Sequence, residues 1–361
     1  MNIFSDKKVN LGRQTEVDLL RGFTAVIIVV CHVGLYLGDP ASTGLYTFCD
    51  IIGSEFAAPV FMALMGIGLV YSGHQSPPAL LKRGVRLFLM GYALSFYRSI
   101  LPLLIGGAMD EWASVEAFFV VDILQFAGLS FMFFSLLKKL RLPSPAIPVL
   151  SVVMVLLDQR LMLPASVPWD SEWLTGLVNL FCPVTDWSCF PFLTWFFFPA
   201  FGLVFGDVLT HCVNKKKLYA VLLPAGLLGV LYVYYRFYCL YPDYTSYYYG
   251  HNFYYMGLKN VLLTALFICF ALAFWFFAGK ILPAALKRFL IFLSRNLNPF
   301  YISTWLVISL LIHWEAIYER TLGTAACIGL MVLLTAVCAG MTKAWIAIKA
   351  ARRKPSQGER G

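Results

Sequence analysis

Arg21 and His32 are the residues whose type and spacing most clearly suggest chemistry. They stand eleven residues apart in an apolar stretch, and at about 100° per residue this spacing places both side chains on one helical face. With a rise of about 1.5 Å per residue, His32 lies roughly 16 Å beyond Arg21, near the middle of a ~30 Å hydrocarbon core. An ionisable side chain at that depth is costly and therefore indicates a functional site. The alternative is a neutral imidazole that shares one hydrogen bond with a neighbouring helix.

Arg98 and Asp122 are two further charges that fall inside apolar runs. Each lies twelve residues from position 110, in the middle of the loop that connects the two runs. An antiparallel helix pair would therefore hold them at one depth, where they can neutralise each other. We interpret them as a structural ion pair in preference to a direct chemical role.

The composition predicts an all-α, polytopic transmembrane helical bundle. Of the 361 residues, 60% are hydrophobic and 13% are charged, and the mean hydropathy is +0.75, which excludes an ordinary soluble globule. The net charge of +9 is better explained by lysines and arginines that set membrane topology than by nucleic-acid binding. No spacing of the H-x-x-x-H or C-x-x-C type occurs, so we expect no metal site.

About ten apolar runs follow one another along the chain. They are 22–38, 53–73, 85–105, 117–137, 146–164, 190–210, 218–238, 259–279, 298–314 and 323–342. Basic residues cluster in alternate connections and in the C-terminal tail, and acidic residues cluster in the others, so both termini are expected to be cytoplasmic. We take 1–345 as a single transmembrane domain and 346–361 as a basic cytoplasmic tail. The first run is expected to be retained, since Arg21 belongs to its face and no clear cleavage site precedes Asp39.

The spacing of Asp18, Arg21 and His32 also resembles a known pattern. An Asp three positions before an Arg, with ten residues between that Arg and a His, is similar to the first span of the membrane-bound acyltransferase-3 superfamily. Within it, VDLLRG most resembles the bacterial relatives of heparan-α-glucosaminide N-acetyltransferase. Further similar strings are PVFMALMGIGL, LLKRGVRLFLMG and VVDILQFAGL, so the resemblance covers nearly the whole chain. It implies an acyltransferase that uses acyl-CoA, most simply acetyl-CoA, as co-substrate.

The resemblance also implies residues that bind the donor. Arg83 and Arg86 either serve only as topology determinants or, as the family implies, contact the phosphates of coenzyme A, which guanidinium groups suit. The string LSRNLNPFYISTWLV places Asn296 and Tyr301 in register with a family helix. The family's histidine in that helix would fall at Thr304, and His313 is the nearest substitute.

Candidate acceptor-binding residues lie toward the other side of the membrane. The segment DWSCFPFLTW resembles a family motif through Asp186 and Trp195. His251 lies in a tyrosine-rich loop, 239–258, which suits either an interfacial anchoring belt or a surface that binds a sugar. Cys182 and Cys189 could form a disulfide in an oxidising periplasm.

Together these patterns predict an integral enzyme of the bacterial cytoplasmic (inner) membrane. It would move an acetyl or other short acyl group from cytoplasmic acyl-CoA to a hydroxyl or amine of an extracytoplasmic sugar or glycan. His32 would act as general base or transient acyl carrier, and Arg21 would hold the donor. Asp18 would orient Arg21, or simply cap the helix. The alternative function is a carrier or flippase for a polar lipid or solute, although no internal repeat of the kind common in transporters is visible.

Overall fold

The computed structural model describes residues 2–73, 75–106, 114–161, 172–182, 189–235, 254–318 and 320–352. The regular structure of these residues is helical, and each of the ten predicted apolar runs falls on one helix or on two or three consecutive helical elements. Eight helices in this part of the chain are long and apolar enough to cross a membrane. The predicted all-α polytopic bundle is therefore confirmed.

The helices are bounded as follows. They are α1 (Thr15–Leu37), α2 (Thr43–Gly53), α3 (Ala58–Val70), α4 (Pro77–Ser95), the π-helical turn η1 (Phe96–Ile100), α5 (Leu101–Gly106), α6 (Val115–Phe118), α7 (Ile123–Lys139), α8 (Ala146–Leu161), α9 (Glu172–Asn179), α10 (Phe192–Trp195), α11 (Phe197–His211), α12 (Lys215–Tyr235), α13 (Leu258–Ile281), α14 (Ala284–Arg295), α15 (Leu297–Tyr318) and α16 (Thr324–Ala351). The expected division at residue 345 falls inside α16.

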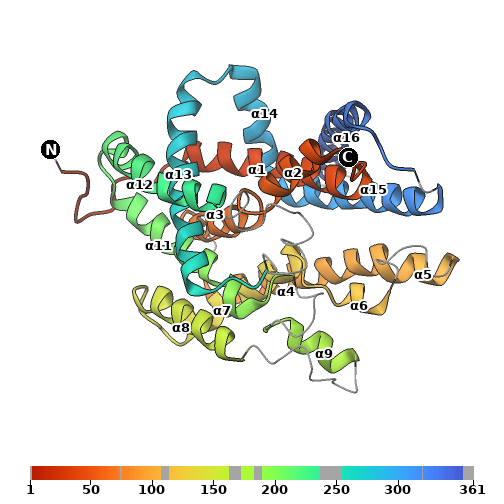
Figure 1. Ribbon diagram of the computed structural model, residues 1–361. Coiled ribbons are helices and arrows are strands. Elements are labelled where there is room, and N and C mark those ends of the chain that lie inside the picture. The colour runs from red at the N-terminus through yellow and green to blue at the C-terminus, as the bar shows by residue number, and fades with distance from the viewer. Residues whose placement is uncertain are drawn as a thin grey trace, which may run out of the picture.

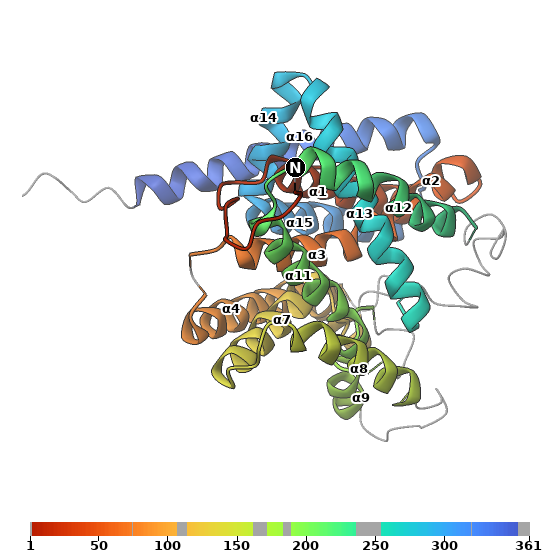
Figure 2. The same ribbon diagram turned by 90° about the vertical axis from the view of Figure 1, so that its left-hand side faces the viewer.

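Helix α1 is the element around which the others assemble. It contacts α2, α3, α13, α14, α15 and α16. Figure 1 shows α1 and α15 in the upper half of the molecule and α4, α7 and α8 in the lower half, with α3 between the halves. The view turned by 90° keeps this order and shows α4 and α7 side by side, in agreement with their extensive contact (Figure 2). Helix α3, which contacts α1 and packs extensively against α11, therefore connects α1 to the lower half, where α11 contacts α8 (Figure 1).

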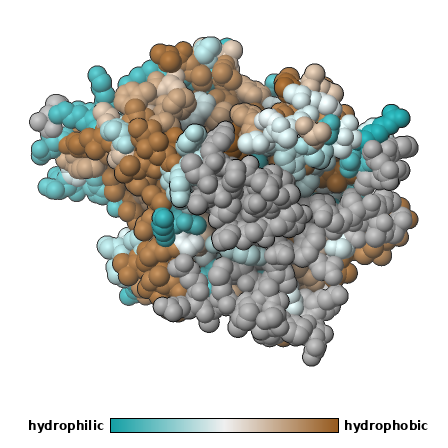
Figure 3. All heavy atoms as spheres, viewed as in Figure 1, coloured by the Kyte–Doolittle hydropathy of each residue, from teal (hydrophilic) through white to brown (hydrophobic). Residues whose placement is uncertain are grey.

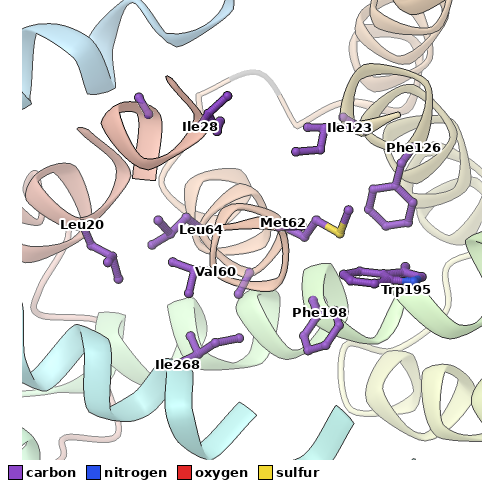
Figure 4. Close-up of a cluster of buried hydrophobic side chains, with 14 of the residues drawn as sticks. Leu20, Ile28, Val60, Met62, Leu64, Ile123, Phe126, Trp195, Phe198 and Ile268 are labelled. Carbon is purple, nitrogen blue, oxygen red and sulfur yellow. The ribbon is translucent and has the colours of Figure 1, made fainter. Parts of the chain in front are cut away.

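Glycines allow the central helices to approach closely. A Cβ atom added to Gly66 of α3 would lie 2.1 Å from the Pro199 carbonyl oxygen, and one added to Gly202 of α11 would lie 1.9 Å from the Ala63 carbonyl oxygen. Backbone contact of this kind is how small residues join helices in lipid. The buried cluster drawn in Figure 4 forms around this crossing, where Met62 of α3 faces the aromatic side chains of Trp195 and Phe198.

Two segments that we assigned to connections are helical. Residues 39–52, which we took as a connection, contain most of α2, and a short turn at 54–57 separates α2 from α3. The basic connection before the ninth run contains α14, an amphipathic helix that buries Leu290 and Leu293 and lies against α1. Its other side carries Lys287 and Arg288. Because this helix is amphipathic and not continuously apolar, a search for apolar runs did not identify it.

The surface suits a lipid environment. Figure 3 shows apolar residues over much of the described part of one face, with hydrophilic residues gathered toward its edges. Large apolar side chains with more than half of their surface exposed occur on several spans; examples are Leu89, Leu104, Val149, Leu231 and Val332. Such exposure is unfavourable in water and neutral among lipid tails.

The charge pattern of the connections predicts the orientation of the bundle. In a cysteine-free parent, we expect Ser114→Cys to be labelled by a membrane-impermeant thiol reagent added outside intact cells, because the positive-inside rule puts that connection outside. Ser144→Cys should be labelled only after the membrane is permeabilised. The reverse pattern would show that the topology is inverted.

Candidate active site

Two cavities lie on either side of the start of α7. The smaller, which we call the chamber, has a volume of about 100 Å³ and is lined by His32, Arg98 and Asp122 among others. The larger, which we call the vestibule, has a volume of about 1570 Å³ and contains most of the arginines that the sequence singled out. Among the described residues Ile123 alone lines both. Two spaces of very different size and charge therefore meet at one side chain.

His32 is held in one tautomer by the backbone of its own helix. Its Nδ1 lies 2.6 Å from the carbonyl oxygen of Ile28, one turn earlier. A carbonyl oxygen only accepts hydrogen bonds, so Nδ1 carries the proton, and in the neutral imidazole Nε2 keeps its lone pair. The ring meets that of Trp305 edge-on, with 4.5 Å between the centroids. His32 is thus a fixed imidazole whose Nε2 can accept a proton.

The structure brings Arg98 and Asp122 together in the wall of the chamber. Nη1 of Arg98 lies 3.3 Å from Oδ2 of Asp122, and the two side chains are 4% and 15% exposed. Arg98 lies in the π-helical turn η1, a rare geometry that recurs at functional sites. Asp122 also caps α7, because its Oδ1 accepts a hydrogen bond of 2.6 Å from the Ile123 N–H. The ion pair therefore fixes both η1 and the first residue of α7.

Tyr301 and Trp305 present polar groups to the same chamber. They lie one turn apart on α15, and each residue is 3% exposed. The Tyr301 hydroxyl interacts with the Asp122 carboxylate and with the Trp305 side chain, although neither contact has the geometry of a regular hydrogen bond. The guanidinium of Arg98 lies 4.6 Å from the centre of the Trp305 ring. Buried donors that lack well-formed hydrogen bonds suit a polar ligand, so these two groups are available to one in the chamber.

The vestibule is strongly basic. Its charged lining residues are Arg13, Arg21, Arg83, Arg86, Arg295 and Lys349. Nη2 of Arg21 donates a hydrogen bond of 2.9 Å to the Leu64 carbonyl oxygen, which holds the guanidinium at the wall of the cavity. Arginines gathered around a cavity of this size suit a ligand with several phosphates.

Asp18 is placed beside Arg21 and one turn inside the helix. The N-cap of α1 is Gln14, so the capping role considered for Asp18 is wrong. Its carboxylate instead forms an ion pair with Arg13, accepts a hydrogen bond of 2.9 Å from the Ser294 hydroxyl, and lies 4.0 Å from Arg21 Nη1. These contacts link α1 to α14.

The other donor-binding candidates divide between the cavities. Arg83 and Arg86 are exposed residues of α4 that line the vestibule, and the Arg83 guanidinium lies 4.1 Å from the centre of the Phe131 ring. Asn296, at the end of α14, lines the vestibule as well. Tyr301 lines the chamber and is thus next to His32 rather than to the arginines.

None of the three acceptor-binding candidates is seen among the described residues that line the chamber. Asp186 and His251 lie outside the described residues. Trp195 is fully buried and does not line the chamber, but it supports two residues that do. Its Nε1 donates a hydrogen bond of 2.9 Å to the Tyr254 carbonyl oxygen, and its ring packs edge-on against Phe190 at 4.8 Å.

Cys182, Cys189 and His313 are the further candidates that the sequence offered, and the structure does not join them into a second reactive centre. Cys182 and Cys189 are free thiols. Cys189 lines the chamber, but burial raises its pKa to about 12, so the thiol stays protonated near neutral pH and is a poor nucleophile. His313 contacts the Arg98 carbonyl oxygen at 3.2 Å and is not among the residues that line the chamber.

Three residues of this site were missed in the sequence. Asp50, which is 5% exposed, lines the chamber from α2, in the segment that we had taken as a loop. Trp305 could have been found, because it stands four residues after Tyr301 and so shares its helical face. Ile123 had no sequence signal, since an isoleucine in an apolar run is usually a lipid-facing or core residue.

A comparison with protein families identifies a match. The family described as "Heparan-alpha-glucosaminide N-acetyltransferase, catalytic" matches residues 13–234. The matched region runs from the start of α1 through nearly all of α12, and it includes Arg21, His32, Arg98 and Asp122. No curated protein and no solved structure matched the chain.

Proposed function

The chain belongs to the heparan-alpha-glucosaminide N-acetyltransferase catalytic family, and from this membership we propose that it transfers an acetyl group from acetyl-CoA across the membrane. The donor would enter the vestibule from the cytoplasm of a bacterium. The acceptor would be an amine or hydroxyl of a sugar or glycan that reaches the chamber from outside the inner membrane. The family supports acetyl transfer at a membrane, and the donor side and the acceptor class are part of the proposal.

One observation carries this proposal: the proton-accepting Nε2 of His32 belongs to a small polar chamber that adjoins a large basic vestibule. Coenzyme A is long and carries its phosphates far from its thioester. The arginines of the vestibule could hold the phosphates, while the thioester passes Ile123 into the chamber. A carrier without chemistry would not require a buried imidazole fixed in the tautomer of a base.

The proposed reaction is a direct acyl transfer. The acceptor nitrogen or oxygen attacks the thioester carbonyl carbon while Nε2 of His32 removes its proton. The carbon–sulfur bond then breaks, and the leaving thiolate of coenzyme A takes the proton from the imidazolium. The Tyr301 hydroxyl and the Trp305 N–H are the groups best suited to stabilise the oxyanion that forms between these steps.

The test is an assay of the purified protein in proteoliposomes. We expect acetyl-CoA to lose its acetyl group, seen as release of the coenzyme A thiol, at a rate that rises when an acceptor is added. Glucosamine offers an amine, and N-acetylglucosamine offers only hydroxyls, so the pair distinguishes N- from O-transfer. Uptake of either sugar without thiol release would instead support the carrier function.

The arginines of the vestibule should act on donor binding. We expect Arg83→Gln and Arg21→Gln each to raise the KM for acetyl-CoA about tenfold, since a hydrogen bond to a charged group is lost, and to change kcat little.

Two controls separate phosphate binding from general damage. Lys82→Gln removes the neighbouring positive charge, which does not line the vestibule, and should leave the KM unchanged. Acetyl-pantetheine lacks the phosphates of the nucleotide, so Arg83→Gln should leave its KM unchanged. An equal loss with both donors would refute the phosphate-binding role.

A further inference from the structure

We propose that Ile123 determines the length of the acyl group and restricts the protein to acetyl. This inference rests on the proposed function, because it concerns the path of the acyl group within the same site. It assigns a specificity-determining role to a residue that is otherwise an ordinary buried isoleucine.

The position of Ile123 between the cavities is the first observation. Among the described residues it alone lines both the chamber and the vestibule. Figure 4 shows its side chain pointing from the start of α7 toward the side where α1 carries Ile28, another residue of the chamber wall. Ile123 therefore stands where the two cavities adjoin, and it is the group that an acyl chain would meet on moving from the vestibule toward His32.

The second observation is that this side chain is held in place. Ile123 is the first residue of α7, and its N–H is bonded to Asp122, which is paired in turn with Arg98. The residue is 7% exposed. A β-branched side chain has few accessible rotamers, so Ile123 cannot easily swing aside. The width of the passage is thereby set by one rigid group.

The third observation is the contrast in volume. The vestibule measures about 1570 Å³ and the chamber about 100 Å³, which is room for only a few water-sized groups. The thioester carbonyl has to reach His32. In an acyl group longer than acetyl, the additional carbons must then either fit in the chamber beside the acceptor or stay in contact with the Ile123 side chain. One additional methylene in a closely fitting pocket can change kcat/KM by about tenfold or more.

The experiment compares acetyl-CoA, propionyl-CoA and butyryl-CoA with one acceptor, glucosamine. We expect the kcat/KM of the wild-type protein to fall at least tenfold from acetyl-CoA to butyryl-CoA. Ile123→Ala should reduce this ratio at least tenfold by widening the passage, and Ile123→Val should lie between the two. Leu124→Ala is the matched control, because Leu124 is the next buried residue of α7 and lines only the vestibule. It should keep the wild-type ratio.

Two results would contradict the proposed role of Ile123, and a third would contradict the proposed function. If the wild-type protein accepts butyryl-CoA as well as acetyl-CoA, or if Ile123→Ala and Leu124→Ala change the ratio equally, Ile123 is not the selector. If no variant, including the wild-type protein, releases thiol from acetyl-CoA, the proposed function itself is wrong.

A second variant covers the case in which Ile123→Ala does not fold. Ile123→Phe narrows the passage and should lower the kcat/KM for acetyl-CoA at least tenfold, while the affinity for free coenzyme A, which needs no passage, stays unchanged. Unchanged turnover of acetyl-CoA by the phenylalanine variant would overturn the inference.

Discussion

We expect the His32→Ala variant to fold, to bind acetyl-CoA with nearly unchanged affinity, and to lose acetyl transfer by at least a hundredfold in kcat. General-base catalysis is typically worth about 10²–10⁴ in rate. His32 lines the chamber and not the vestibule, so its removal should leave donor binding intact. A fall in kcat without a rise in the dissociation constant is the signature of an interaction made only in the transition state. The measurements are steady-state kcat with glucosamine and the affinity for coenzyme A.

A second substitution separates the base from the hydrogen bond that positions it. The amide nitrogen of an asparagine at position 32 can replace Nδ1 as donor to the Ile28 carbonyl oxygen, but asparagine has no basic nitrogen. We therefore expect His32→Asn to be as inactive as His32→Ala while keeping wild-type thermal stability. His313→Ala is the control histidine, since His313 does not line the chamber, and it should remain active. Near-normal turnover of His32→Asn would exclude His32 as the base.

Direct transfer with His32 as general base differs in its expected intermediates from a mechanism in which His32 is a transient acyl carrier. A carrier would accumulate an acetyl group on His32 when acetyl-CoA is supplied without acceptor, and it would give ping-pong kinetics. A general base would give neither. Intact-protein mass spectrometry of the wild-type protein, with His32→Ala as the reference, measures the difference directly.

Much of the architecture was predictable because a bilayer imposes simple rules. Spans must be apolar and long, and the described part of every predicted run is helical, in some runs as two or three consecutive elements. The resemblance to heparan-α-glucosaminide N-acetyltransferase, which rested on VDLLRG and the sequence that follows it, is confirmed by the family match. The wider acyltransferase-3 superfamily and the closeness to bacterial relatives stay predictions.

The spacing of Arg21 and His32 predicted one shared helical face, and the structure adds that the two residues belong to different cavities. Periodicity gives the direction of a side chain on its own helix but not what faces it. The vestibule is formed by α1, α3, α4, α7, α14, α15 and α16 together, and such an arrangement depends on tertiary contacts that no single stretch encodes.

The irregular helix geometry around the chamber could not be predicted from the sequence either. The π-helical turn η1 lies in an apolar run that reads as a regular helix, yet it carries Arg98. The break between α2 and α3 at 54–57 places Asp50 in the chamber wall. In both cases a local departure from regular helix brings a charged residue to the site, and apolar periodicity cannot reveal such a departure.

Arg98 and Asp122 should be coupled strongly in stability. We expect Arg98→Met or Asp122→Asn alone to destabilise the protein by about 3–5 kcal/mol, because either change leaves a buried charge without its partner. The double variant leaves neither charge and should be more stable than at least one of the single variants. Methionine keeps an unbranched apolar stem and removes the guanidinium that lies over the Trp305 ring. Asparagine can still accept the hydrogen bond from the Ile123 N–H, so the cap of α7 survives.

The measurement is the thermal unfolding midpoint in detergent of the wild-type protein, the two single variants and the double variant. Asp122→Leu provides the control for the cap: it removes the charge and the acceptor for Ile123 together, so it should be less stable than Asp122→Asn by about 1 kcal/mol. Losses that simply add in the double variant would mean that the two charges do not depend on each other. Coupled losses would mean that the two charges stabilise each other and so join η1 to the start of α7.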